Sequence, residues 1–227
     1  MNYKLKIDAI IFDLDGTLID SRDIYFKVLE EIFSRLNLPL VSKEIILEIM
    51  RKSSKDWGDL FSEETEERRA RLVNEAKAIF KEVFPRMFRK DNKMIPGAGK
   101  IIRQISSEGV KVGMVTSTHF DYLDGKLDPL KKTGIYDLIE SIVCIEDTPK
   151  FKPEPDPLIE CARRLGVSMD KSVYVGDSCV DIRAGRAAGM KTVGVLTGMD
   201  SYETLKKEDP DVIMDSVADL LKMLRRI

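Results

Sequence analysis

Short apolar segments alternate with amphipathic segments along most of the chain. The first apolar segment, residues 8–12, is rich in strand-forming residues and leads into a polar turn at Gly16. Segments with helical spacing end before Gly109, Gly166 and Gly189, and another closes the chain at 217–227. Further strands are predicted at 110–115, 141–145, 172–175, 192–196 and 212–214. This alternation predicts an α/β fold, a doubly wound parallel sheet with helices on both faces.

Residues 21–93 interrupt the alternation, because they contain no strand pattern. Apolar residues follow helical spacing over 24–36, 45–50 and 72–87, and antiparallel packing would bury these three stripes together. We therefore expect an inserted all-helical domain at residues 19–93. The core domain would then consist of residues 1–18 and 94–227.

Composition narrows the class of protein. Lys and Arg total 37 against 39 Asp and Glu, a net charge of −2 that argues against nucleic-acid binding through global positive charge. No apolar run reaches the ~18 residues of a membrane span, and the apolar start is too short for a signal peptide. Three scattered cysteines do not resemble a disulfide framework, so a cytoplasmic protein with reduced thiols is expected.

Acidic side chains follow two of the predicted strands. Asp13 and Asp15 lie two residues apart after the first strand, so an extended backbone would point them the same way. Two adjacent carboxylates repel unless a cation holds them or one is protonated. Asp177 and Asp181 follow the strand at 172–175, one helical turn apart. Turn capping would be the purely structural explanation, but carboxylates meeting at one sheet edge indicate an oxygen-rich site that suits Mg²⁺.

Hydroxyl and cationic groups follow two other strands. Thr116 and Ser117 come directly after the strand at 110–115, where hydroxyls and backbone N–H groups can cradle phosphate oxygens. Lys152 lies beyond the strand at 141–145, in a segment stiffened by two prolines. Carboxylates, a metal, hydroxyls and a fixed ammonium together suit phosphoryl transfer with an Asp nucleophile.

These motifs resemble those of the haloacid dehalogenase (HAD) superfamily, in particular its phosphoglycolate-phosphatase-like members with a helical cap. The segment Asp13-Leu-Asp-Gly-Thr-Leu-Ile-Asp-Ser21 resembles the first motif and Thr116 the second. Lys152 resembles the third motif, and the pattern from Gly176 to Asp181 resembles the fourth. The resemblance implies an HAD-like core and a helical insert that closes over the site.

The resemblance also implies catalytic roles. Asp13 would be the nucleophile and a metal ligand. Asp15 would protonate the leaving oxygen and then activate water, and its main-chain carbonyl would bind Mg²⁺. Lys152 would bridge Asp13 and the phosphate.

The remaining motif residues would bind phosphate and metal. Thr116 and the Ser117 backbone would hold the phosphoryl oxygens. Asp177 would bind Mg²⁺ directly, and Asp181 would support it or bind through water. The implied activity is Mg²⁺-dependent hydrolysis of a small phosphomonoester through an aspartyl-phosphate.

A few residues narrow the choice among branches of the HAD superfamily and among substrates. The namesake dehalogenases lack the second Asp of the first motif, which this chain has as Asp15. β-Phosphoglucomutases usually have a Glu where this chain has Gly176, so a hydrolase rather than a mutase is expected. A pyrophosphatase or a sugar-phosphate phosphatase stays an alternative. Arg51, Lys52 and His119 are candidates for substrate contact, with ordinary surface positions as the alternative. The partner would be a small phosphorylated metabolite, and the protein a monomer or homodimer.

Two other classes of function share some of these features. Phospho-accepting signalling modules also combine an acceptor Asp, a Thr or Ser, a Lys and Mg²⁺, but they are about half this length and have no helical insert. A binding module without turnover should have lost at least one of Asp13, Asp15, Lys152 or Asp177, and all four are present.

Overall fold

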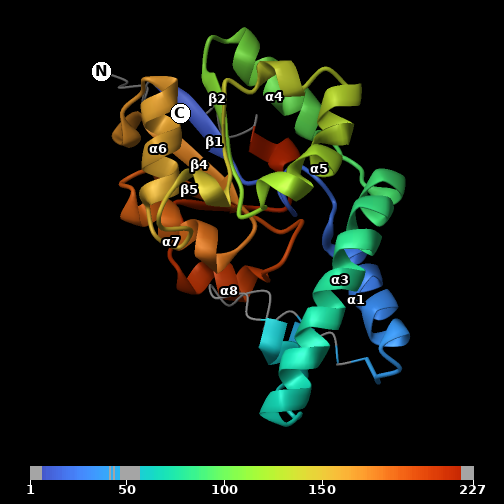
Figure 1. Ribbon diagram of the computed structural model, residues 1–227. Helices are drawn as coiled ribbons and strands as arrows, with labels where there is room; N and C mark the ends of the chain where they lie inside the picture. Colours follow the sequence, from blue (N-terminus) through green and yellow to red (C-terminus); the bar gives the residue numbers. More distant parts are fainter. Residues whose placement is uncertain (1–6, 41, 43, 47–56, 221–227) are drawn as a thin grey trace.

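A six-stranded parallel sheet forms the centre of the molecule (Figure 1). The structure, a computed structural model, describes residues 7–40, 42, 44–46 and 57–220. The strands lie in the order β3-β2-β1-β4-β5-β6, so β1 has a neighbour on each side and the topology switches direction there. Their bounds are β1 (Ala9–Phe12), β2 (Lys111–Val115), β3 (Ser141–Val143), β4 (Ser172–Gly176), β5 (Lys191–Val195) and β6 (Val212–Met214). The predicted strands and fold class are confirmed.

Helices cover both faces of the sheet, and the side chains of β1 alternate between two apolar clusters. Ile10 and Phe12 of β1 join the cluster that includes α4 and α5, whereas Ala9 and Ile11 join the cluster with α6 and α7. The helices of this layer arrangement are α4 (Ala98–Ser107), α5 (Phe120–Lys132), α6 (Asp156–Leu165), α7 (Cys179–Ala187) and α8 (Tyr202–Lys207). Short 3₁₀ turns lie between them: η2 (Tyr136–Leu138), η3 (Ile145–Asp147), η4 (Met169–Lys171) and η5 (Val217–Asp219).

Three details differ from the sequence prediction, one of them the short helix α8, which was not predicted. Helix α5 was not expected, because Gly125 and Pro129 interrupt its sequence and both residues disfavour helix interiors. It forms because its leucines bury one face against the core. The helix predicted at 217–227 begins with the turn η5, and residues 221–227 lie outside the described part of the chain.

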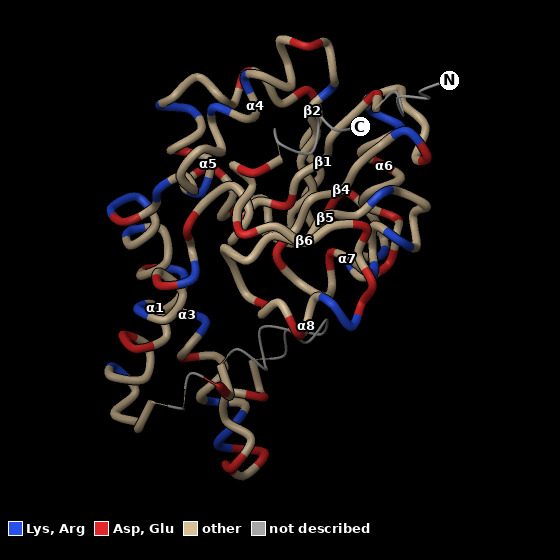
Figure 2. The backbone as a smooth tube through the Cα atoms, turned by 180° about the vertical axis from the view of Figure 1, so that it is seen from behind, with Lys and Arg blue, Asp and Glu red and all other residues tan. Residues whose placement is uncertain are grey.

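The helical insert stands beside the sheet and is built on a pair of long helices, α1 (Arg22–Arg35) and α3 (Glu66–Asp91), which run side by side (Figure 1). The turn η1 (Trp57–Phe61) packs against α3. The predicted helix at 45–50 falls mostly on residues outside those described. Charges of both signs alternate along α1 and α3 (Figure 2).

The two chain segments that connect the insert to the core lie next to each other. The backbone N–H of Asp20 donates to the carbonyl of Lys93 at 2.9 Å, and that of Ile95 donates to the carbonyl of Leu18 at 2.9 Å. Both ends of the insert therefore leave the core at one place, directly beyond β1. None of the helices in the described ranges is long and apolar enough to cross a membrane.

Candidate active site

The motif residues meet at the carboxyl edge of the sheet, around the switch in strand order. Asp13 directly follows β1, Thr116 follows β2, and Asp177 follows β4. The N–H of Asp13 donates to the Val175 carbonyl, which continues the sheet ladder into the site. The carboxylates of Asp13, Asp177 and Asp181 are buried, with oxygens within 4.8 Å of one another. The structure thus brings together three acidic residues from two motifs 164 residues apart in the chain, counted from 13 to 177.

Lys152 lies at the centre of this acidic group. Its Nζ donates to Asp13 Oδ1 at 2.7 Å, to Asp181 Oδ1 at 2.7 Å and to the Tyr174 hydroxyl at 3.0 Å. Burial alone would lower the pKa of Lys152, but the carboxylates of Asp13 and Asp181 outweigh it and hold the pKa well above its usual value. Lys152 is therefore a permanent, fixed cation beside Asp13.

The acidic residues carry more negative charge than one lysine can neutralise. Burial, together with the charges of Asp181 and Asp15, raises the pKa of Asp13 to about 7, although Lys152 acts in the opposite direction. Burial and the nearby charges of Asp181 and Asp13 raise the pKa of Asp177 well above its usual value. Desolvated carboxylates this close together are what a hard divalent cation requires, so the donor set fits Mg²⁺.

Glycines allow Asp177 to be enclosed by backbone. A Cβ atom on Gly198 would lie 1.9 Å from Asp177 Oδ2, and one on Gly16, whose φ is +77°, would lie 2.5 Å from it. The N–H of Met199 donates to the same oxygen at 2.5 Å. The loop after β5, which the sequence analysis did not assign to the site, therefore helps to position Asp177.

Asp181 is already engaged by protein donors. Its Oδ1 accepts from Lys152 and from the Tyr174 hydroxyl at 3.0 Å, and its Oδ2 accepts from the Ser178 hydroxyl at 2.5 Å. Ser178 caps α7 in return. This geometry fits a residue that orients Lys152 and supports the metal site.

The hydroxyl groups after β2 form a short chain. Thr116 Oγ1 donates to Thr118 Oγ1 at 2.9 Å and accepts from the Thr118 N–H at 3.1 Å. Thr118 Oγ1 in turn lies 3.2 Å from Asp15 Oδ2. Ser117 stands between the two threonines at the end of the strand. The chain of hydroxyls joins the predicted phosphate cradle to the predicted acid–base residue.

Comparison with known proteins identifies this arrangement. Residues 10–195 match the family of haloacid dehalogenase-like hydrolases, which covers all four motifs. The chain belongs to this family. The family, fold class and enzyme class predicted from the sequence are confirmed.

Relatives of the HAD family resemble the chain over nearly its whole length. It is 29% identical over 222 residues to a protein of Clostridium perfringens named, provisionally, as the pyrophosphatase PpaX, covering 97% of this chain and 99% of that one. It is 28% identical to the phosphoglycolate phosphatase of Nitrosococcus oceani, covering 96% of each chain. The crystal structure of a hydrolase from Pseudomonas syringae superposes with a TM-score of 0.75 at 27% identity, covering 97% of this chain and 99% of that one.

Outside the HAD motifs, the structure adds a second buried lysine. Lys126 of α5 donates to Asp15 Oδ2 at 2.5 Å, to the Tyr25 hydroxyl at 2.6 Å and to Thr118 Oγ1 at 2.8 Å. Burial alone would lower the pKa of Lys126. The nearby charge of Asp15 and the Tyr25 hydroxyl raise this pKa by more than burial lowers it, so the net shift is upward. The sequence carries a signal for this residue: Lys126 falls in register with Leu123, Leu127 and Leu130 on the buried face of its helix.

Of the three candidates for substrate contact, only His119 lies in the described part of the chain. The ring Nδ1 of His119 lies 2.7 Å from Glu146 Oε1, and its side chain is 62% exposed. Arg51 and Lys52 lie outside the described residues. Substrate contact by these three residues stays a prediction.

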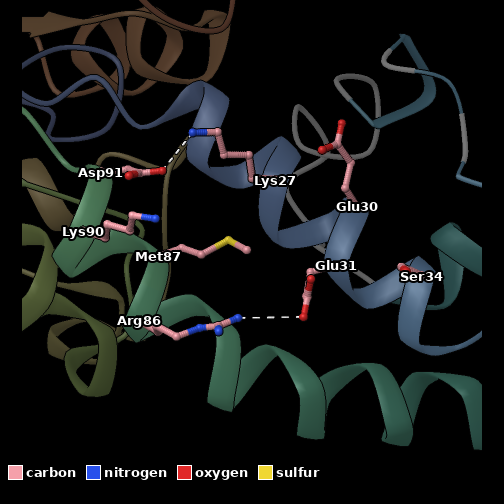
Figure 3. A pocket seen from close by; sticks show the side chains of 8 residues that line it. All are labelled: Lys27, Glu30, Glu31, Ser34, Arg86, Met87, Lys90 and Asp91. Carbon is pink, nitrogen blue, oxygen red and sulfur yellow. Dashed lines mark hydrogen bonds and ion pairs between the residues drawn. The ribbon is translucent and has the colours of Figure 1, made fainter.

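A groove on the insert lies apart from the HAD motifs. Its lining residues all come from α1 and α3, and Figure 3 shows Lys27 directed toward Asp91 and Arg86 toward Glu31. The nitrogen and oxygen atoms of these two ion pairs lie 2.8 Å and 3.8 Å apart, respectively. The groove is therefore lined by side chains of both charges. Since no motif residue lines it, this groove has no part in the chemistry argued below.

Proposed function

We propose that the protein is a cytoplasmic, Mg²⁺-dependent phosphatase that hydrolyses a small phosphomonoester through an aspartyl-phosphate. One observation carries the proposal: the Asp13 carboxylate is held at the carboxyl edge of the sheet, 2.7 Å from a buried ammonium group and beside two further carboxylates. A buried carboxylate fixed next to positive charge is suited to attack a phosphoryl group and to share the charge that develops on it.

In the first step, Asp13 attacks phosphorus. A bond forms between a carboxylate oxygen and phosphorus while the bond from phosphorus to the leaving oxygen breaks. Asp15, two residues further along the same loop, gives its proton to the leaving oxygen. Lys152 neutralises charge on the transferred group, and the turn at Thr116 and Ser117 holds its oxygens.

In the second step, Asp15 acts as a base. It takes a proton from water as the water oxygen attacks phosphorus, and the bond between phosphorus and Asp13 breaks. Inorganic phosphate leaves, while Asp13 is again a carboxylate and Asp15 is again protonated. The same residue serves both steps because each step leaves it in the state that the other requires.

Asp13 and Asp177 would hold the metal ion, with the Asp15 main-chain carbonyl as a further ligand and Asp181 in support. Bound there, Mg²⁺ would supply charge neutralisation to the phosphoryl oxygens and offset repulsion among the carboxylates.

The helical insert, with domain bounds of 19–93, would select the substrate by covering this edge of the sheet. The catalytic carboxylates of Asp13 and Asp177 are almost completely buried in the described structure. A small substrate is therefore favoured. The names of the relatives support phosphoglycolate first and pyrophosphate as the alternative.

A screen of small phosphate compounds tests the proposal. The purified protein would be assayed for phosphate release from phosphoglycolate, pyrophosphate and sugar phosphates, with Mg²⁺, with EDTA, and with Mg²⁺ restored. We expect turnover that EDTA removes and Mg²⁺ restores. Activity that is indifferent to chelation would contradict the metal site. A protein that becomes phosphorylated once without turnover would instead be a signalling module.

A further inference from the structure

The ammonium group of Lys126 is fully satisfied by protein oxygens. It has three N–H donors, and three acceptors lie within 2.8 Å: Asp15 Oδ2, the Tyr25 hydroxyl and Thr118 Oγ1. The residue is completely buried. Lys126 differs from Lys152 in the group that it holds, because its acceptors include Asp15 whereas those of Lys152 include Asp13.

The surroundings of Lys126 come from both parts of the molecule. Asp15 and Thr118 belong to the loops after β1 and β2, whereas Tyr25 belongs to α1 of the insert. The rings of Phe84 and Phe88 on α3 lie 5.6 Å and 5.3 Å from Nζ, within the range of cation–π attraction. The lysine therefore joins the predicted acid–base residue to two helices of the insert.

We propose that Lys126 is a positioning residue that fixes the orientation of the Asp15 carboxyl and links that orientation to the seating of the helical insert on the core. The proposal rests on the phosphatase function proposed above. Asp15 must present one oxygen to the leaving group and later to water. Its other bonds decide which direction that oxygen faces, and Lys126 and Thr118 both bind Oδ2.

This role predicts an effect that depends on the leaving group. A poor leaving group, such as an alkoxide, needs a proton in the transition state, whereas dinitrophenolate leaves without one. A misdirected Asp15 therefore slows phosphoryl transfer to Asp13 from alkyl phosphates and leaves transfer from dinitrophenyl phosphate almost unaffected. The later attack of water needs Asp15 whatever the ester, so only the first step, which kcat/KM reports, depends on the leaving group. A merely structural role for Lys126 would lower the rates for all esters by the same factor.

The experiment compares Lys126→Met with the wild-type protein on an ester series from 2,4-dinitrophenyl phosphate through phenyl phosphate to an alkyl phosphate. We expect kcat/KM, which reports the steps up to release of the leaving group, to fall roughly 10- to 100-fold on the alkyl ester and less than about threefold on the dinitrophenyl ester. We expect KM for the alkyl ester, on which the first step limits turnover, to stay within about twofold, because Lys126 donates no bond to substrate.

A second variant covers the case in which Lys126→Met fails to fold. Tyr25→Phe keeps the buried charge and removes only the hydroxyl contributed by the insert. We expect it to produce the same graded loss in a weaker form. Lys132→Met is the matched control, since Lys132 lies on the same helix with its side chain 72% exposed, and we expect it to behave as wild type.

The outcomes separate this inference from the proposed function. Wild-type turnover with an equal loss on every ester in Lys126→Met and Tyr25→Phe would overturn the positioning role alone. A raised KM with unchanged kcat would also overturn it, because Lys126 would then bind substrate. If the wild-type protein hydrolyses none of the esters, the proposed function fails and this inference fails with it.

Discussion

Two buried lysines contact the loop that follows β1, one at Asp13 and the other at Asp15, and they are held in different surroundings. Lys152 is surrounded by carboxylates of the core domain, Asp13 and Asp181. Lys126 is held by one carboxylate, Asp15, and otherwise by hydroxyls and aromatic rings, several of them from the insert. Both would lose charge through burial alone, and both are kept charged by their neighbours.

The difference shows how one short loop can support two chemical tasks. In the proposed mechanism, Asp13 attacks where charge on phosphorus is neutralised, while Asp15 transfers the proton. The first task needs only the core. The second would depend on the insert as well, because Lys126 contacts both Asp15 and Tyr25 of the insert.

The largest effect is expected from Asp13→Asn. An amide cannot attack phosphorus, so turnover should fall at least ~10⁴-fold on good and poor leaving groups alike. Phosphate release would be measured on both ends of the ester series, with circular dichroism to verify folding. Near wild-type turnover by a folded variant would end the assignment of Asp13 as the nucleophile.

Asp15→Asn should have a smaller and graded effect. We expect a loss of about 10²- to 10⁴-fold on alkyl phosphates, since proton transfer to the leaving oxygen is removed. With a good leaving group the first step survives while water activation does not, so phosphoenzyme should accumulate. Mass spectrometry of the quenched protein would detect the added phosphoryl group. Absence of both the trapped species and the rate loss would contradict the acid–base role.

Lys152→Met sharpens the comparison between the two lysines. We expect kcat to fall about 10²- to 10³-fold by a similar factor on every ester, because charge neutralisation at phosphorus is needed whatever the leaving group. This uniform loss contrasts with the graded loss expected for Lys126→Met. A graded loss in Lys152→Met would show that the two lysines do not divide the tasks as argued here.

The smallest effect is expected at an exposed ion pair. Arg163 and Arg164 lower the pKa of Glu160 to about 2, so this group stabilises the fold above its ordinary pKa and loses that contribution as pH falls toward 2. Glu160→Gln should therefore differ slightly from wild type at neutral pH, and the difference should shrink in acid and in high salt. Urea unfolding at two pH values and two salt concentrations would measure it. A difference that persists in high salt would show that the pair acts through more than exposed charge.

The sheet and the four motifs were predictable because their signals are local. Each strand is a short apolar run next to a turn, and each motif residue follows a strand end, where parallel strands bring polar residues together. Asp13, Asp177 and Lys152 could therefore be expected at one edge, although 25 residues separate even the nearest two, 152 and 177.

Lys126, Tyr25 and Tyr174 were not predicted, because their roles depend on distant partners. Lys126 is 111 residues from Asp15 and 101 residues from Tyr25 along the chain. Its helix was also missed, since Gly125 and Pro129 weaken the helical pattern. This lysine gains its partners only because α5 packs against α3, which brings aromatic rings of the helical insert close to Nζ.

The paired connections at Leu18–Ile95 and Asp20–Lys93 have a consequence for how such proteins diversify. Because the insert leaves and rejoins the core at neighbouring points, another helical unit with closely spaced ends could replace it without breaking any strand of the sheet. Transplanting a foreign insert between these two points would exchange selectivity while the machinery for phosphoryl transfer is inherited whole. The donor unit would have to bring its own counterpart of Tyr25.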